Sequence, residues 1–217
     1  MKFADRWEAG RALADRLRAR QVDGGLVDPL VLALPRGGVP VAAEVARALH
    51  APLDVLVARK IGLPGRPEVG IGAVVGADPP LFAPRALEAI GLTEAQLAPD
   101  VARERAELRR REDLYRPGMP PIAVHGRTVL LIDDGLATGV TARAALRHLR
   151  GRQPARLILA VPVCGTASAA DPRQEADEFL AVHQPPDFRG VGEWYENFDQ
   201  VQDSEVIDIL HRLGSAV

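Results

Sequence analysis

The stretch Val129-Leu130-Leu131-Ile132-Asp133-Asp134-Gly135-Leu136-Ala137-Thr138-Gly139-Val140-Thr141-Ala142 decides the fold of this chain. Residues 129–132 form an apolar run of β-forming residues, which is too short for a typical helix and indicates a strand buried on both faces. A polar turn that contains glycine follows directly. After the turn, apolar residues recur at helical spacing, namely Ala142, Ala145, Leu146 and Leu149. The stretch therefore predicts a strand, a loop and a helix in succession.

The loop of this unit carries candidate ligand-binding residues. In open parallel sheets, ligands bind just beyond the carboxyl ends of the strands, where Asp133 and Asp134 fall. Residues 137–141 are small, and their backbone N–H groups can surround a phosphate at a helix N-terminus. Carboxylates beside such a loop suit a ligand with both hydroxyls and phosphate, such as a phosphorylated sugar with a divalent cation. The alternative is an ordinary turn with a threonine N-cap, for which adjacent acids at a buried strand end are a poor choice.

Composition restricts the class of protein. A chain of 217 residues, 47% hydrophobic and 26% charged, can bury one well-formed globular core. The net charge of −2 and the pI near 6.2 argue against a general nucleic-acid binder. A single cysteine, Cys164, excludes an internal disulfide and fits a reducing cytosol. No stretch resembles a signal peptide or a membrane span, so we expect a cytoplasmic protein without membrane contact.

The remaining pattern predicts a single α/β domain over residues 1–217. An amphipathic helix over 3–20 is expected to cover a mainly parallel sheet flanked by helices. The expected strands span residues 30–34, 53–58, 128–132, 156–163 and 178–182, and a terminal amphipathic helix follows the last of them.

Two further turns add basic residues to the same edge of the sheet. The first predicted strand is followed by Arg36, Gly37 and Gly38, where the glycines let backbone amides approach an anion and the arginine adds a fixed charge. The second predicted strand ends at Arg59 and Lys60. Their alternative interpretation is a pair of solvated charges at a loop entrance, but their place at the edge favours binding.

The region after Lys60 is rich in glycine. Residues 61–68 contain Gly and Pro and predict a mobile loop. Residues 69–76 superficially resemble a dinucleotide-binding fingerprint, but the spacing is wrong and no helix pattern follows. These glycines are therefore expected in a strand or hairpin.

Two segments depart from the core pattern. Residues 82–118 predict a helical insertion with a short helix near 84–90 and a long, highly charged helix over 100–114. Because so charged a helix has little core face, we expect an arm that acts as a lid or as the contact of a homodimer. Its arginines, Arg103, Arg109, Arg110 and Arg111, are expected mostly in i, i+4 ion pairs. Residues 184–203 concentrate aromatic side chains, and Trp194 there either stacks on a planar base or packs the C-terminal tail.

The segment Val129 to Thr141 resembles the phosphoribosyl pyrophosphate motif of the type I phosphoribosyltransferases. The resemblance implies that Asp133 and Asp134 hold the ribose hydroxyls and Mg²⁺. It implies that the following loop wraps the 5′-phosphate through Ala137, Thr138, Gly139, Val140 and Thr141. It also implies pyrophosphate contacts from the turn at Arg36 to Gly38 and from a basic residue near Lys60, and a variable hood over the acceptor from 184–203.

The resemblance further implies transfer of a phosphoribosyl group from phosphoribosyl pyrophosphate to an acceptor, a nitrogenous base, with release of pyrophosphate. In the 6-oxopurine enzymes of the family the phosphate loop begins with a carboxylate, whereas here it begins with Ala137, as in the adenine-type loop. That difference does not name the acceptor. Two alternatives remain: a regulator that senses phosphoribosyl pyrophosphate or nucleotides without catalysis, and a phosphoacceptor receiver domain, whose acidic pair normally comes earlier in the chain.

Overall fold

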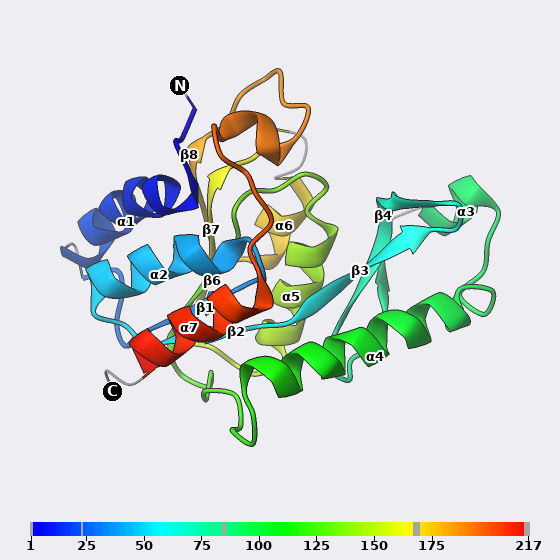
Figure 1. Ribbon diagram of the computed structural model, residues 1–217, viewed down its shortest axis with the longest axis horizontal. Coiled ribbons are helices and arrows are strands. Elements are labelled where there is room, and N and C mark those ends of the chain that lie inside the picture. Colours follow the sequence, from blue (N-terminus) through cyan, green and yellow to red (C-terminus); the bar gives the residue numbers. More distant parts are fainter. Residues whose placement is uncertain (1, 23, 84–85, 167–169, 215–217) are drawn as a thin grey trace.

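The computed structural model describes residues 2–22, 24–83, 86–166 and 170–214. Its core is a five-stranded sheet in the order β2-β1-β6-β7-β8, and all neighbouring strands are parallel (Figure 1). The strands are β1 (Pro29–Ala33), β2 (Leu53–Val55), β6 (Thr128–Ile132), β7 (Arg156–Val163) and β8 (Glu178–His183). This architecture confirms the predicted α/β class with a parallel sheet.

Helices cover both faces of this sheet, which is why the central strands β1, β6 and β7 are almost entirely apolar. One face packs against α1 (Arg6–Val22), α2 (Gly38–Leu49) and α7 (Asp203–Gly214), and the other against α5 (Val140–Arg150). Alternate residues of β1 reach opposite cores: Val31 joins the first and Leu32 the second. A short helix, α6 (Ala170–Glu175), connects β7 to β8.

The strand order creates a crevice at the carboxyl edge of the sheet. From β1 the chain passes through α2 to β2 on one side, whereas β6 lies against the other side of β1. The connections that leave β1 and β6 therefore diverge, and in open α/β sheets ligands bind at such a switch point. The predicted binding turns after these two strands meet here.

A second, three-stranded antiparallel sheet extends from the core (Figure 1). It contains β3 (Ala58–Leu63), β4 (Arg66–Val75) and β5 (Leu81–Phe82), and the helices α3 (Ala86–Ile90) and α4 (Ala98–Tyr115) follow it. The glycines of 69–76 do lie in a hairpin, as predicted. The expected loop over 61–68 is wrong, because those residues form the hairpin's strands and its turn, where Gly65 adopts φ +79°.

The predicted strand over 53–58 is also wrong in extent. β2 ends at Val55, and a separate strand of the second sheet begins at Ala58. Arg59 and Lys60 consequently lie within a hairpin strand instead of at the end of a core strand. The apolar run misled because Val57 and Ala58 are buried while the chain crosses from one sheet to the other.

The helices predicted within 82–118 are present, and in a capping box before α4 the Thr93 N–H donates to Gln96 Oε1 at 2.9 Å. The expectation that α4 has little core face is confirmed, because Leu108 and Tyr115 are the only buried residues among those described for this helix. These two residues, with Leu97 just before the helix, join the same cluster as residues of the parallel sheet and of β3. The helix is therefore attached to the core at a few apolar positions.

Across the described ranges, no helix combines the length and apolarity that a membrane crossing requires.

A large-to-small substitution tests whether α4 belongs to the core. We expect Leu108→Ala to lower the free energy of unfolding by about 2–5 kcal/mol, because the side chain is 1% exposed and would leave a cavity. Met119→Ala, at a side chain 61% exposed, is the control and should change it by no more than about 0.5 kcal/mol. Denaturant unfolding measures both, and equal small effects would contradict the packing described for α4.

Candidate functional site

Two loops meet at the switch point, one after β1 and one after β6. A Cβ atom on Gly37 would collide with the Asp134 carboxylate, and one on Gly38 would lie 2.8 Å from the Ile132 carbonyl oxygen. Only glycine permits this approach. The predicted turn at Arg36 to Gly38 and the predicted acidic pair are thus in direct contact.

A cavity of about 200 Å³ opens beside the acidic pair. Its lining joins four parts of the chain: Asp133 at the end of β6, the loop and first turn of α5, Lys60 with Gly70 from the hairpin, and Val191. The loop contributes Gly135, Leu136, Ala137, Thr138 and Gly139, and α5, which begins at Val140, contributes Thr141 and Ala142. Gly139 adopts φ +72° immediately before the helix, so the loop turns its backbone toward the helix N-terminus.

The expectation that Lys60 ends a core strand is wrong, but the residue does lie beside the loop that leads into α5. Its side chain reaches the cavity from β3, with its stem within contact distance of the position that a Cβ on Gly70 would occupy. Arg59, the preceding residue, faces α4, where its Nε and Nη2 atoms donate to Glu104 Oε2 at 3.1 and 2.8 Å. Arg59 and Lys60 also line a second hollow, of about 390 Å³, between the hairpin and α4.

Burial dominates the electrostatics of the acidic pair. It raises the pKa of Asp133 well above its usual range, and the neighbouring Asp134 carboxylate raises it further. Burial also raises the pKa of Asp134, although the guanidinium of Arg6 opposes that effect. The Asp134 N–H donates to Asp133 Oδ1 at 2.9 Å, which fixes the orientation of the first carboxylate. The site thus holds closely spaced acids whose ionised forms are stabilised by an added cation.

Arg6 is a residue of this site that sequence reasoning missed. Its Nε donates to Asp134 Oδ2 at 2.8 Å from the start of α1. Nothing in the amphipathic pattern of the first helix distinguishes this arginine from the others on the same helix. Only the tertiary contact identifies it.

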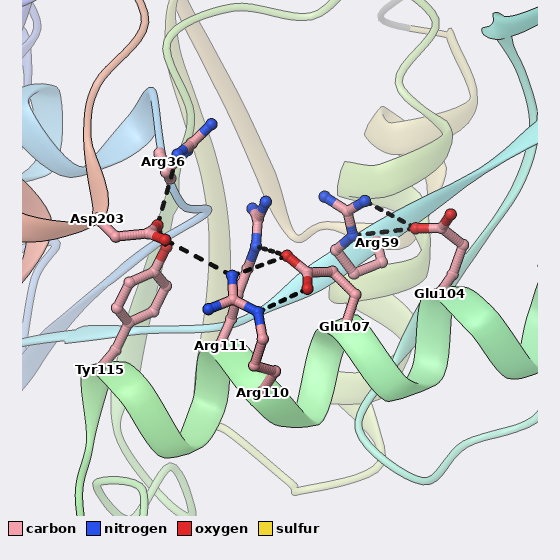
Figure 2. Close-up of polar contacts among 8 residues, drawn as sticks. All are labelled: Arg36, Arg59, Glu104, Glu107, Arg110, Arg111, Tyr115 and Asp203. Atoms are coloured by element: carbon pink, nitrogen blue, oxygen red, sulfur yellow. Dashed lines mark hydrogen bonds and ion pairs between the residues drawn. The ribbon is translucent and has the colours of Figure 1, made fainter.

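Helix α4 presents a row of charges to the same edge (Figure 2). Arg36 lies 3.6 Å from Asp203, and Glu107 accepts from Arg110 and Arg111 at 2.7 Å each. Hydrogen bonding from Arg110 is the largest cause that lowers the pKa of Glu107 to about 2.

The expectation of i, i+4 ion pairs on this helix is confirmed for Arg111, whereas Arg103 and Arg110 pair at i, i+3 spacing. Arg110 and Arg111 both pair with Glu107, and Arg103 pairs with Asp100 at 2.9 Å. Figure 2 shows Arg36, Arg59 and Arg111 extending toward the same side of α4. The Arg111 side chain is only 14% exposed, so its guanidinium is largely shielded from solvent.

The C-terminal hood segment reaches the cavity through Val191, which lies against Gly135. Trp194 instead lies 6.0 Å from the ring of His183 and packs in a small cluster with Phe3 and Tyr195. Of the two interpretations of Trp194, its present contacts are those of tail packing. The stacking of a base on this ring stays a prediction.

The donor set fits a magnesium ion that arrives with its substrate. Among the described residues, no group of three or more His, Cys, Asp or Glu side chains could hold a metal by itself. Mg²⁺ is usually bound by one or two carboxylates together with substrate phosphates and water. Asp133 and Asp134 supply that number of carboxylates beside a phosphate-sized cavity.

Comparison with known proteins identifies the family. The model of the phosphoribosyl transferase domain matches residues 6–193, and the chain belongs to this family. Two Mycobacterium tuberculosis proteins, from two strains and both named provisionally as phosphoribosyl transferases, are 41% identical over 97% of this chain. The chain spans about half the length, 46%, of these curated relatives.

Solved structures support the same grouping. The chain resembles the crystal structure of TT1426 from Thermus thermophilus, with a TM-score of 0.80 and 41% identity over 98% of this chain and 99% of that one. A hypoxanthine-guanine phosphoribosyl transferase of L. donovani has a TM-score of 0.50 at 14% identity, over 91% of this chain and 95% of that one, and shares the fold. The family and fold exclude the receiver-domain interpretation.

The raised pKa of Asp133 gives a pH-dependent prediction. Because folded Asp133 keeps its proton where the unfolded side chain, with a pKa of about 3.9, has lost it, stability falls as pH rises from about 4 through the folded pKa. Asp133→Asn does not titrate and can still accept from the Asp134 N–H. We therefore expect its melting temperature to exceed that of the native chain by a margin that widens as the pH rises above about 4.

Thermal unfolding across this pH range measures the margin. Asp15→Asn, at an exposed position on α1, serves as the matched control and should show no widening. A native chain that gains stability relative to Asp133→Asn as pH rises would contradict the burial of this charge.

Proposed function

We propose that this protein is a phosphoribosyltransferase that transfers a phosphoribosyl group from phosphoribosyl pyrophosphate to a nitrogenous base and releases pyrophosphate. The observation that carries the proposal is the cavity at the switch point, where Asp133, the loop into α5 and Lys60 line one space. That lining offers acceptors for sugar hydroxyls, backbone donors for a phosphate and a cation, and phosphoribosyl pyrophosphate needs all three.

Each part of the substrate has a proposed partner. Asp133 and Asp134 accept hydrogen bonds from the ribose hydroxyls and provide the carboxylates for Mg²⁺. The loop of residues 137–141 surrounds the 5′-phosphate with backbone N–H groups and the hydroxyls of Thr138 and Thr141. Mg²⁺, when bound with the substrate, neutralises charge on the pyrophosphate.

The leaving group lies between the two loops in this proposal. The backbone at Gly37 and Gly38 approaches it closely, while Lys60 and Arg36 supply positive charge. Arg59, held by Glu104, adds a cation at the outer edge. As the bond to pyrophosphate breaks, negative charge grows on the leaving oxygens and positive charge on the sugar. Cations on one side and carboxylates on the other therefore stabilise the transition state more than the ground state.

The hood segment, residues 184–203, and the helical insertion, residues 82–118, border the proposed site. Neither identifies the acceptor. Val191 and the loop at Gly135 border the cavity on the side where an acceptor would enter, and Ala137 provides no carboxylate to act on a base. Helix α4, held by buried and charged contacts, borders the hollow beside Arg59 and Lys60. Its roles as a lid or as a dimer contact remain proposals, as does a cytoplasmic location.

A non-catalytic sensor of phosphoribosyl pyrophosphate or nucleotides is the second candidate, because the same cavity would serve binding alone. The low net charge and the chain's pI give no support to a DNA-binding role. Incubation with phosphoribosyl pyrophosphate, Mg²⁺ and a panel of bases, read by pyrophosphate release, separates the two. Binding with no release for any base would favour the sensor.

Titration calorimetry tests the binding site itself. We expect Mg²⁺-dependent binding of ribose 5-phosphate and of phosphoribosyl pyrophosphate to the native chain. Replacing Asp133 and Asp134 together by Asn should weaken both by about tenfold or more, the scale of a lost charge-assisted hydrogen bond, without unfolding the protein. No binding at millimolar ligand with Mg²⁺ would refute the proposed site, and a loss of folding would show a structural role for the pair.

Lys60 provides a test of the pyrophosphate side. Lys60→Met keeps the aliphatic stem across Gly70 and removes the charge, so affinity for pyrophosphate should fall by about tenfold while affinity for ribose 5-phosphate changes little. Lys2 is the other lysine of the chain and is exposed, which makes Lys2→Met the matched control. Equal losses for the two ligands would place Lys60 elsewhere in the site.

A further inference from the structure

Arg6 connects the first helix to both the acidic pair and the C-terminal segment. Its Nε donates to Asp134 Oδ2 at 2.8 Å, and its Nη1 donates to the Asp199 carbonyl oxygen at 2.8 Å. The arginine side chain is 10% exposed and the aspartate side chain 14%. One guanidinium therefore joins residues that lie more than sixty positions apart at the edge of the binding cavity.

Aromatic rings connect Arg6 to Asp134 by a second route. The Arg6 guanidinium carbon lies 3.9 Å from the centroid of the Phe198 ring, which stacks on the Tyr195 ring at 5.0 Å. The Tyr195 hydroxyl donates to the Asp134 carbonyl oxygen at 2.6 Å. Both the side chain and the backbone of Asp134 are thus held, one through Arg6 and the other through Tyr195.

Backbone hydrogen bonds hold the same C-terminal segment against the N-terminus. The Glu196 N–H donates to the Phe3 carbonyl oxygen at 2.8 Å, and the Asn197 N–H donates to the Ala4 carbonyl oxygen at 2.9 Å. These amides lie between the ring of Tyr195 and the Asp199 carbonyl that Arg6 contacts. Their exchange with solvent reports directly on whether the segment is held.

The two acids of the pair consequently have different surroundings. Asp133 lines the cavity, whereas the Asp134 carboxylate lies between Arg6 and the close-approaching backbone of Gly37. The Arg6 guanidinium gives this carboxylate one charge-assisted hydrogen bond and uses a second N–H for the Asp199 carbonyl oxygen. Rotation of Asp134 is therefore restricted by a residue that belongs to neither binding loop.

We infer that Arg6 is a positioning residue: it sets the orientation of the Asp134 carboxylate for the sugar hydroxyls and, by the same contact, holds residues 195–199 over the loop that follows β6. The inference rests on the proposed function for the identity of the ligand, but the contact it describes exists in the ligand-free protein. The state in which residues 195–199 are held in place is then also the state in which the Asp134 carboxylate is oriented for the ligand.

Hydrogen exchange of the ligand-free protein tests whether Arg6 holds residues 195–199 in place. Arg6→Gln should speed exchange at the amides of Glu196 and Asn197 severalfold, while Arg18→Gln, an exposed substitution on the same helix, should not. In an Asp134→Asn background, Arg6→Gln should add less than it does alone, because the two side chains act through one contact. Unchanged exchange in Arg6→Gln, or full additivity with Asp134→Asn, would overturn the inference.

Ligand binding tests the positioning role. Calorimetry with ribose 5-phosphate and Mg²⁺ should show about a tenfold loss for Arg6→Gln, no loss for Arg18→Gln, and recovery of most of the affinity in Arg6→Lys, which keeps a charged donor for Asp134. A merely structural role predicts that Arg6→Lys and Arg6→Gln behave alike, and that result would overturn the inference. If the native chain fails to bind ribose 5-phosphate, that result refutes the proposed function instead. The exchange experiment still tests whether Arg6 holds residues 195–199 in place.

Discussion

The structure depends on one close approach, between the glycine turn after β1 and the acidic loop after β6. At Gly37 and Gly38 there is no room for a side chain, because the Asp134 carboxylate and the Ile132 carbonyl oxygen occupy the space. The approach follows from the sheet order, in which β1 and β6 are hydrogen-bonded neighbours whose connections run in opposite directions. These diverging connections leave a crevice at this point of the carboxyl edge, where a ligand can bind.

Charge at this crevice is separated by origin. The acids come from the parallel sheet, whereas Lys60 and Arg59 come from the antiparallel hairpin. Burial makes the ionised forms of Asp133 and Asp134 unfavourable in the ligand-free protein, and it raises the pKa of both carboxyl groups. Lys60 is exposed and Arg59 is paired with Glu104, so neither basic side chain carries a comparable desolvation cost. A ligand that brings hydroxyls and Mg²⁺ to one side and phosphates to the other relieves both conditions at once.

Sequence reasoning succeeded where a local pattern determines the local structure. The run 129–132 could only be a buried strand, and the loop after it could be recognised because its strand, acids and small residues occur in a fixed order. It failed at 53–68, because apolar residues there are buried by two different sheets and glycine served the turn and irregular pairing of a hairpin. It also could not show what α4 packs against, since the apolar partners of Leu108 are distant in sequence.

Arg6 illustrates the kind of residue that a pattern cannot reveal. On a helical wheel it is one more arginine among several, and its meaning comes from Asp134, Phe198 and Asp199, which converge on it only after the sheet has formed. Such a contact joins the first residue of the matched family region, 6–193, to its centre and to the segment that follows the region. Because the same guanidinium serves an acid of the proposed ligand site and the backbone of the C-terminal segment, removing it must disturb both. The geometry of the proposed sugar-binding edge therefore depends on contacts across the whole fold and not on residues 129–141 alone.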